Sequence, residues 1–225
     1  MIKLVIFLAI LLTLQHTQAL AEPFDLRGFR LGMTLAEFRS TPYPDPGKYK
    51  GVHVKCSDDR ESKRSKVPLT LKPYGIEAKV GLVRCNHYHD HKTLELPWVE
   101  EATLNVAGVQ VYMTFDFYRD PKAPSILRLF RINIKSNMQH WGRLWSAYNT
   151  KFGQPTDIVK SVVQNSYGTS FNKIVAFWVR DGSSIMLESH DVKIYLIRIV
   201  YMFDTVADYF FKQIERITGK PTDKL

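Results

Sequence analysis

The sequence predicts an α+β fold in which helices pack on one face of antiparallel β-sheets. Apolar residues alternate with polar ones over long parts of 102–135 and 158–203, the period that strands require. Over 138–152 they recur instead at steps of three and four, the period of an amphipathic helix. No crossover helix separates most neighbouring strands, so we expect antiparallel pairing. The order helix, sheet, helix, sheet, helix is compatible with two helix-plus-sheet repeats.

The first 21 residues have the pattern of a cleavable secretory signal. Lys3 provides a positive charge, residues 4–14 form a short apolar stretch, and residues 19–21 (ALA) provide a small-x-small cleavage motif. We therefore expect the mature protein to begin at Glu22 and to be periplasmic or secreted. No cysteine lies near the cleavage motif, and no later stretch is long and apolar enough to cross a membrane. The mature chain should have no integral membrane span.

The predicted mature chain has 204 residues, enough for one large domain or two small ones. Its composition, 45% hydrophobic and 12% aromatic in the full sequence, is typical of a packed globular protein. We divide it into an N-terminal half, 22–135, and a C-terminal half, 136–225, each expected to contain a helix followed by an antiparallel sheet.

The N-terminal half begins with a short helix. Thr34 and Glu37 have the spacing of a capping box, Phe38 lies on the inward face with Leu35, and Pro42 ends the helix. A strand is predicted at 52–56, followed by an exposed loop at 57–74. From residue 78 to residue 85 the period is two, which predicts another strand.

The clearest local pattern is a β-hairpin with its turn at Ala107-Gly108. The strand after this turn alternates between an apolar face and a polar face that includes Thr114 and Asp116. A further strand follows at 126–135, after a polar turn. The helix at 138–152 has an aromatic stripe that we expect to be buried on a sheet, formed by Trp141, Leu144, Trp145 and Tyr148.

Strands are predicted at 158–165, 172–180, 184–190 and 193–203. Asp181-Gly182 marks a tight turn between the second and third of these strands. The last helix is expected to begin with an Asp204 cap and to end at Gly219.

The mature chain contains two cysteines, Cys56 and Cys85. In an oxidising compartment an even pair is most simply one disulfide. Closing a loop of about thirty residues stabilises the folded state by roughly 3–4 kcal/mol in the chain-entropy view.

The net charge of the chain is +9, and the excess is concentrated between residues 48 and 92, with eleven Lys and Arg against five Asp and Glu. Such a surface attracts anionic partners. Lys63, Arg64 and Lys66 are the candidate contacts to an anionic glycan or lipid headgroup. The alternative is a solvated loop whose neighbouring acidic residues offset these charges. An exported protein rarely meets nucleic acid, so nucleic acid is not an expected partner.

Three histidines, His87, His89 and His91, alternate along one predicted strand and could face the same side. No spacing identifies a fourth ligand, so we expect no native metal and no cofactor. A catalytic site is not expected either, because His190-Asp191 has no identifiable partner and Ser183-Ser184 follows a turn rather than forming a nucleophile elbow.

Residues 28–38 (GFRLGMTLAEF) resemble the opening of the exported module that β-lactamase-inhibitor-protein-like domains share with small outer-membrane assembly lipoproteins. The hairpin around 106–109 and the helix exit at 152–155 (FGQP) are similar to the corresponding parts of that module. The family mostly binds proteins. The long basic insertion at 57–74 and the missing LGMT start in the second half depart from its pattern.

The resemblance implies an exported, non-enzymatic protein of the bacterial cell envelope that binds another envelope protein or acts as an inhibitor. Two alternatives stay open: a basic module that binds anionic envelope glycans or lipid headgroups, and a hydrolase or metal-dependent enzyme. The sequence names neither the partner nor the oligomeric state.

Overall fold

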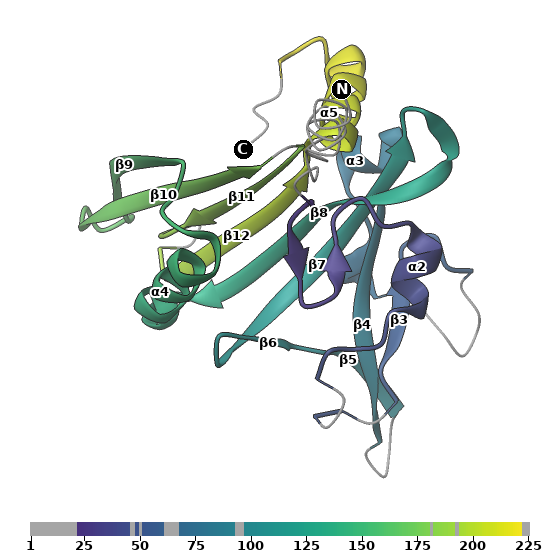
Figure 1. The fold of residues 1–225 in the computed structure, drawn as a ribbon, viewed down its shortest axis with the longest axis horizontal. Helices are drawn as coiled ribbons and strands as arrows, with labels where there is room; N and C mark the ends of the chain where they lie inside the picture. Colours follow the sequence, from purple (N-terminus) through teal and green to yellow (C-terminus); the bar gives the residue numbers. More distant parts are fainter. Residues whose placement is uncertain are drawn as a thin grey trace, which may run out of the picture.

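A computed structural model describes residues 22–45, 48–49, 51–60, 68–92, 97–180, 182–191 and 194–221. The predicted signal at 1–21 lies outside these residues. The described chain is a mixed α+β fold dominated by antiparallel strands (Figure 1). No helix of the described chain is long and apolar enough to cross a membrane.

The elements up to the middle of the chain are β1 (Asp25–Leu26), β2 (Phe29–Arg30), α2 (Leu35–Ser40), β3 (His53–Cys56), the 3₁₀ helix η1 (Leu69–Leu71), α3 (Gly75–Val80), β4 (Val83–Lys92), β5 (Pro97–Glu101), β6 (Leu104–Val106), β7 (Val109–Asp120) and β8 (Ala123–Asn137). The remaining elements are the 3₁₀ helix η2 (Met138–His140), α4 (Trp141–Phe152), β9 (Asp157–Gln164), β10 (Ser170–Arg180), β11 (Ser183–Glu188), β12 (Leu196–Phe203) and α5 (Asp204–Thr218).

The described strands form one ten-stranded sheet and a separate β1–β2 hairpin. The main path through the large sheet is β3-β4-β7-β8-β12-β11-β10-β9, while β5 pairs with β4 and β6 pairs with β7. Every pair in this path is antiparallel. From each outer edge the strands follow chain order inward, so that β8 and β12 meet at the centre. Each run of strands is preceded by a helix, α2 or α4.

The predicted division into halves at 135/136 falls inside β8, which continues to Asn137. Whether 22–135 and 136–225 are separate domains or true repeats stays a prediction. What the sheet order adds is that the two runs of strands are joined edge to edge by the pairing of β8 with β12.

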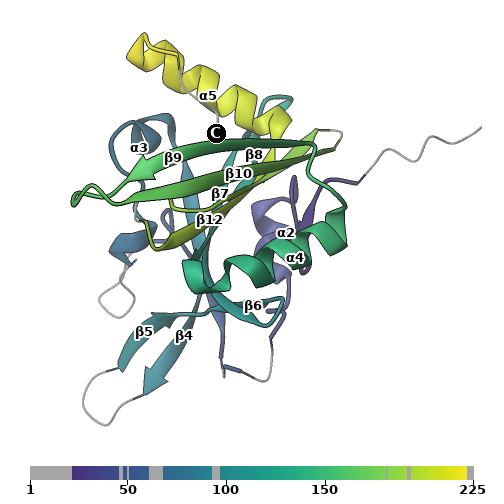
Figure 2. The ribbon, with the colours of Figure 1, turned by 90° about the vertical axis from the view of Figure 1, so that its left-hand side faces the viewer.

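Helices contact both faces of the sheet, which corrects the prediction that they lie on one face. Phe38 of α2 and Leu144 of α4 belong to a core cluster with Ile132 and Ile199 of the sheet. Phe210 of α5 belongs to a second cluster, which also contains residues of α3. Figure 2 shows α5 above β9, β10 and β12, and α4 and α2 below these strands. Helices can pack on both faces because β8, β11 and β12 have apolar side chains on both faces of the sheet.

Local sequence signals account for several element ends. Thr34 accepts a hydrogen bond from the Glu37 backbone N–H, and the Glu37 side chain accepts from the Thr34 backbone N–H, which confirms the capping box. Asn137 caps η2 through its side chain, and α4 ends at Gly153. Ala107 and Gly108 have φ of 53° and 78°, the left-handed conformation that a tight hairpin turn needs.

The stretch 78–85 was predicted as a strand, but its first part is the end of α3, and β4 begins only at Val83. Gly81 adopts a left-handed φ of 83° and ends this helix. Val80 packs in the α5 cluster, so its burial comes from a helix contact rather than from a sheet. Over so few residues the apolar pattern fits either period.

The predicted exposed loop at 57–74 is also wrong in part. Residues 61–67 lie outside the described chain, whereas Leu71 of η1 is fully buried against Tyr88. At the last helix, Asp204 is not the cap. Phe203 is the N-cap, and Asp204 lies in the first turn, where it accepts a hydrogen bond from the Ser184 hydroxyl at 3.3 Å.

The aromatic stripe of α4 is buried only in part. Leu144 and Tyr148 are fully buried, and the Tyr148 hydroxyl lies 2.9 Å from that of Tyr201. Trp141 and Trp145 are half-buried at the edge of the same cluster and stack on each other. Leu144 and Tyr148 are therefore core residues, whereas Trp141 and Trp145 remain partly exposed.

Candidate functional site

The candidate site lies on the face of the sheet that α5 shares. At one end of this face, α3 and α5 cover the strands (Figure 1). At the other end no α-helix of the described chain packs on the strands. Here alternate residues of β7, β8 and β12 point outward. We call this surface the open face and define it by Tyr112, Thr114, Asn133, Lys135 and Arg198.

Strand register brings the open-face residues directly opposite one another. Tyr112 pairs with Lys135 between β7 and β8, and Lys135 pairs with Arg198 between β8 and β12. Arg198 in turn pairs with Glu188 of β11. Residues opposite each other on one face of antiparallel strands have neighbouring side chains, so these four form a row across the sheet.

The open face is hollowed. A groove of about 520 Å³ lies over it, and its lining also includes Arg84, Arg131 and Glu101. A second hollow of about 560 Å³, toward β9 and β10, shares Asp191 and Arg198 with the first. The two hollows therefore border each other and give a continuous polar surface across the sheet.

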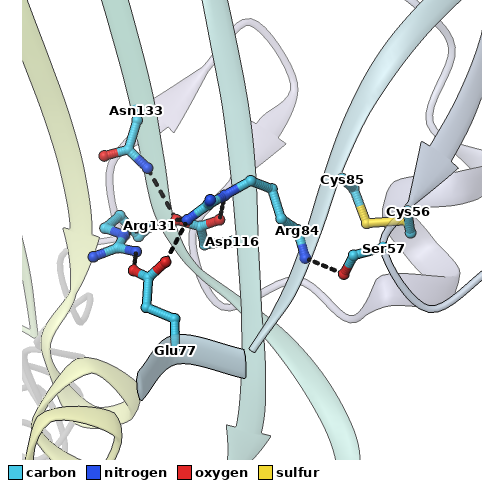
Figure 3. A network of polar contacts seen from close by, with 8 residues as sticks. All are labelled: Cys56, Ser57, Glu77, Arg84, Cys85, Asp116, Arg131 and Asn133. Carbon is cyan, nitrogen blue, oxygen red and sulfur yellow. Dashed lines mark hydrogen bonds and ion pairs between the residues drawn. A yellow bond between two sulfur atoms is a disulfide. The ribbon is translucent and has the colours of Figure 1, made fainter. Parts of the chain in front are cut away.

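A buried ion-pair network supports one side of the groove (Figure 3). Asp116 of β7 is completely buried, and its carboxylate accepts from Arg84 Nε at 2.7 Å and from Arg131 Nε at 2.8 Å. It also accepts from the Asn133 amide at 3.0 Å. Glu77 of α3 joins both guanidinium groups, at 3.1 Å from Arg84 and 2.8 Å from Arg131. The network thus links three strands to α3.

The charge state of this network follows from its contacts. Burial alone would raise the pKa of Asp116, but the adjacent Arg131 and Arg84 outweigh burial and hold that pKa below its usual value. Asp116 is therefore ionised at neutral pH. The two arginines remain charged and are held in fixed positions by their carboxylate partners.

The other side of the groove is also held by ion pairs. Glu188 pairs with Arg198 at 2.9 Å and with Lys173, while Asp191 lies 3.7 Å from Arg198. Lys135 is exposed, and we find no hydrogen-bond or ion-pair partner for it in the described part of the chain.

The predicted histidine cluster is described at two of its three members, His87 and His89, and these have different aromatic neighbours. His87 is 2% exposed, and its ring is surrounded by those of Phe29, Phe38, Tyr43 and Phe115 at 5.1–5.7 Å. His89 instead stacks on Tyr49 at 4.3 Å. His91 lies in β4, but its side chain is outside the description. The absence of a native metal stays a prediction.

Among described residues, one group of metal-ligating types comes together, Cys56, Asp58 and Asp59. Cys56 is bonded to Cys85, so its sulfur is not a thiolate ligand. The disulfide confirms the predicted pairing and joins β3 and β4, where the two cysteines are directly opposite.

The predicted anionic-partner residues Lys63, Arg64 and Lys66 lie outside the described chain. Two described members of the basic region have protein partners. Lys48 contacts the Thr103 hydroxyl at 2.6 Å, and Arg84 belongs to the Asp116 network. The charge of the region is therefore not all available to a ligand.

The pair His190-Asp191 lines the second hollow. His190 has a left-handed φ of 51°, and its Nδ1 lies 2.6 Å from the Ile194 carbonyl oxygen. Asp191 is directed to Arg198. The described contacts thus pair neither residue with a nucleophile.

The chain is thus an antiparallel α+β module whose open face is hollowed and lined mostly by polar residues. No protein-family model, curated protein or solved structure matches this chain.

Sequence reasoning placed Thr114 and Asp116 on the polar face of their strand but did not connect them to Arg84, Arg131 or Asn133. The alternation of Arg131, Asn133 and Lys135 in β8 was a usable signal, since it puts three polar side chains on one face of the strand while Ile132 and Ile134 lie on the other. A charged residue in the middle of a hydrophobic strand requires a partner on a neighbouring strand.

Proposed function

We propose that the protein is an exported, non-enzymatic binding protein of the bacterial cell envelope, periplasmic or secreted, that holds another envelope protein on its open face. The observation that carries the proposal is the groove over the uncovered part of the sheet, with an exposed tyrosine and fixed arginines in its lining. Tyrosine and arginine are enriched among the residues that dominate binding energy at protein interfaces.

The rigidity of the surface supports this proposal. Arg84 and Arg131 are held by Asp116 and Glu77, and they lie on strands rather than on loops. A side chain that is already fixed loses little conformational freedom when a partner binds. Tyr112 is 59% exposed beside these residues, and a partner can cover its ring.

The balance of charge favours a protein over an anionic glycan or lipid surface. Three of the four cations that line the groove, Arg84, Arg131 and Arg198, have carboxylate partners, and Lys135 is the exception in the described chain. A polyanion would have to compete with these internal carboxylates. A protein surface that carries both positive and negative groups is complementary to the paired cations and carboxylates of the groove.

The test is capture of partners from an envelope extract by the wild type and by the double variant Tyr112→Ala, Lys135→Glu. A protein captured by the wild type in low and in high salt, and lost in the double variant, supports the proposal. Tyr195→Ala is the matched control, because Tyr195 has nearly the same exposure, 55%, and does not line the groove. Loss of the partner in this control, or capture only of salt-labile glycan or lipid, contradicts the proposal.

A further inference from the structure

The outer edge of the sheet at β9 differs from the open face. β9 pairs with β10 alone, through eight successive residue pairs without a register shift, and it is the last strand of the sheet path. Seven of its eight residues are exposed. Natural proteins usually protect such edges with proline, bulges, charge or short length. β9 contains no proline and one lysine.

The side chains along this edge are unusually apolar for an exposed strand. Ile158, Val159 and Val162 are 41%, 49% and 64% exposed. Val179 of β10 and Tyr167 in the connecting turn are exposed as well, at 55% and 92%. Half of the ten most exposed large hydrophobic side chains of the described chain therefore lie on the β9–β10 hairpin.

Hydrogen-bond alternation shows which backbone groups of β9 point outward. Asn165 N–H donates to the Thr169 carbonyl oxygen at 3.0 Å, continuing the β9–β10 ladder. Hydrogen-bonded and non-bonded residue pairs alternate in an antiparallel ladder. The backbone N–H and C=O groups of residues 159, 161 and 163 therefore bond to β10. Those of residues 158, 160, 162 and 164 point away from β10, toward the open edge. The β10–β11 ladder agrees, because Ser189 N–H donates to the Ile174 carbonyl oxygen.

One outward donor is already used within the strand, since Ile158 N–H donates to the Asp157 carboxylate at 2.8 Å. For the outward N–H groups of Lys160, Val162 and Gln164 we find no partner among the described residues. Three donors in alternate positions are a template for another strand.

We propose that β9 pairs antiparallel with β9 of a second copy of this chain, about a two-fold axis through Ser161. A two-fold axis perpendicular to the sheet keeps the same face outward in both copies, so the residues opposite each other must have the same parity. With Ser161 opposite its equivalent, Lys160 faces Val162 of the second copy, and Val159 faces Val163. The pairing is isologous and buries valines of both copies.

Charge and overlap select this register over its neighbours. Moving the axis to Lys160 would place two lysine side chains directly opposite each other, which is unfavourable. Moving it to Val162 would pair Ile158 with Ser166, outside β9, and would shorten the overlap. The Ser161 register pairs residues 158–164 of the two copies and brings no like charges opposite each other. This self-complementarity identifies a second copy as the occupant.

The first experiment measures molar mass by sedimentation equilibrium from ~1 to ~100 µM. The wild type should change from monomer to dimer in this range. Val162→Pro removes one outward N–H and no bond to β10, a position where an edge strand tolerates proline. It should raise the dissociation constant at least about tenfold. Val162→Thr, which retains the N–H, should still dimerise.

A monomeric wild type at every concentration would overturn the proposal, as would a Val162→Pro variant that dimerises like the wild type. Binding of an extended peptide by a chain that stays monomeric would assign the edge to a different partner and would also overturn it. Equal thermal midpoints for the proline and threonine variants below the dimer range show that both fold.

The second experiment tests the register by oxidative cross-linking of Ser161→Cys. Residues opposite each other in a non-bonded antiparallel pair have Cα atoms about 4.5 Å apart, within the range of a disulfide. The native cysteines are already bonded to each other, so the new thiol has no internal competitor. Ser161→Cys should cross-link into dimers faster than Lys160→Cys. The reverse order, or no cross-link at either position, contradicts the Ser161 register.

Discussion

The buried His87 should make the protein sensitive to mild acid. Among the residues that the structure describes, neither of its ring nitrogens has a hydrogen-bond partner, and four aromatic rings surround the imidazole. Burial lowers the pKa of His87 from 6.5 to about 4, with a smaller contribution from the charge of His53. The folded state therefore binds fewer protons than the unfolded state between about pH 6.5 and about pH 4, and stability falls as the pH falls through this window.

The size of the effect follows from the two pKa values. Between about pH 7.5 and about pH 4.5, a single group with a pKa of 6.5 unfolded and about 4 folded removes about 2.5 kcal/mol from the free energy of unfolding. His87→Leu, which replaces the ring with an apolar side chain of similar volume, removes this contribution. At neutral pH the variant should be as stable as the wild type or more so, because a buried unpaired polar group is lost.

The assay is urea unfolding of wild type and His87→Leu at the two pH values. On acidification the free energy of unfolding of the wild type should fall by about 2.5 kcal/mol more than that of the variant. Because each protein is compared with itself at the two pH values, a packing change that the substitution causes at both values cancels. His140→Gln, at the start of α4, is the control and should behave like the wild type. An equal loss in wild type and His87→Leu would refute the assignment of acid sensitivity to His87.

Three further changes test the core. Asp116→Asn removes the buried carboxylate that two half-buried arginines share and should lower the free energy of unfolding by about 3–5 kcal/mol, measured in urea at neutral pH; a loss below about 1 kcal/mol would mean that Glu77 alone is enough to hold the two arginines. Reducing Cys56–Cys85 should cost about 3–4 kcal/mol in the same assay, and an unchanged midpoint would contradict this. Leu144→Ala should cost about 3–5 kcal/mol by thermal unfolding and more than Trp145→Ala, and the opposite order would show that the exposed side of α4 dominates.

Features that depend on neighbouring residues in the chain could be predicted from sequence. The capping box at Thr34 and Glu37 and the hairpin turn at Ala107-Gly108 both involve partners within a few residues. The α3 helix was missed because its six residues are fewer than two helical turns, too few to separate one period from another. The burial of Leu71 was missed because its partner, Tyr88, lies in β4 and is not a near neighbour in the chain.

The candidate site was harder to predict, because it depends on the relative register of strands. Thr114 and Asp116 were correctly placed on a polar face, yet that face becomes a groove only when β8 brings Arg131 and β4 brings Arg84 beside Asp116. A bulge between Asp116 and Phe117 shifts this register by one residue. No local pattern contains that shift.

The meeting of the two runs of strands at β8 and β12 has a consequence for synthesis of the chain. These partners lie about 60 to 70 residues apart, whereas the other pairs of the C-terminal run are hairpin neighbours. β8 is complete at Asn137, but its neighbour is not made until residues 196–203. Through that interval the growing chain has an open central edge with apolar side chains on both faces. Premature termination after β11 would leave this edge permanently uncovered and prone to aggregate.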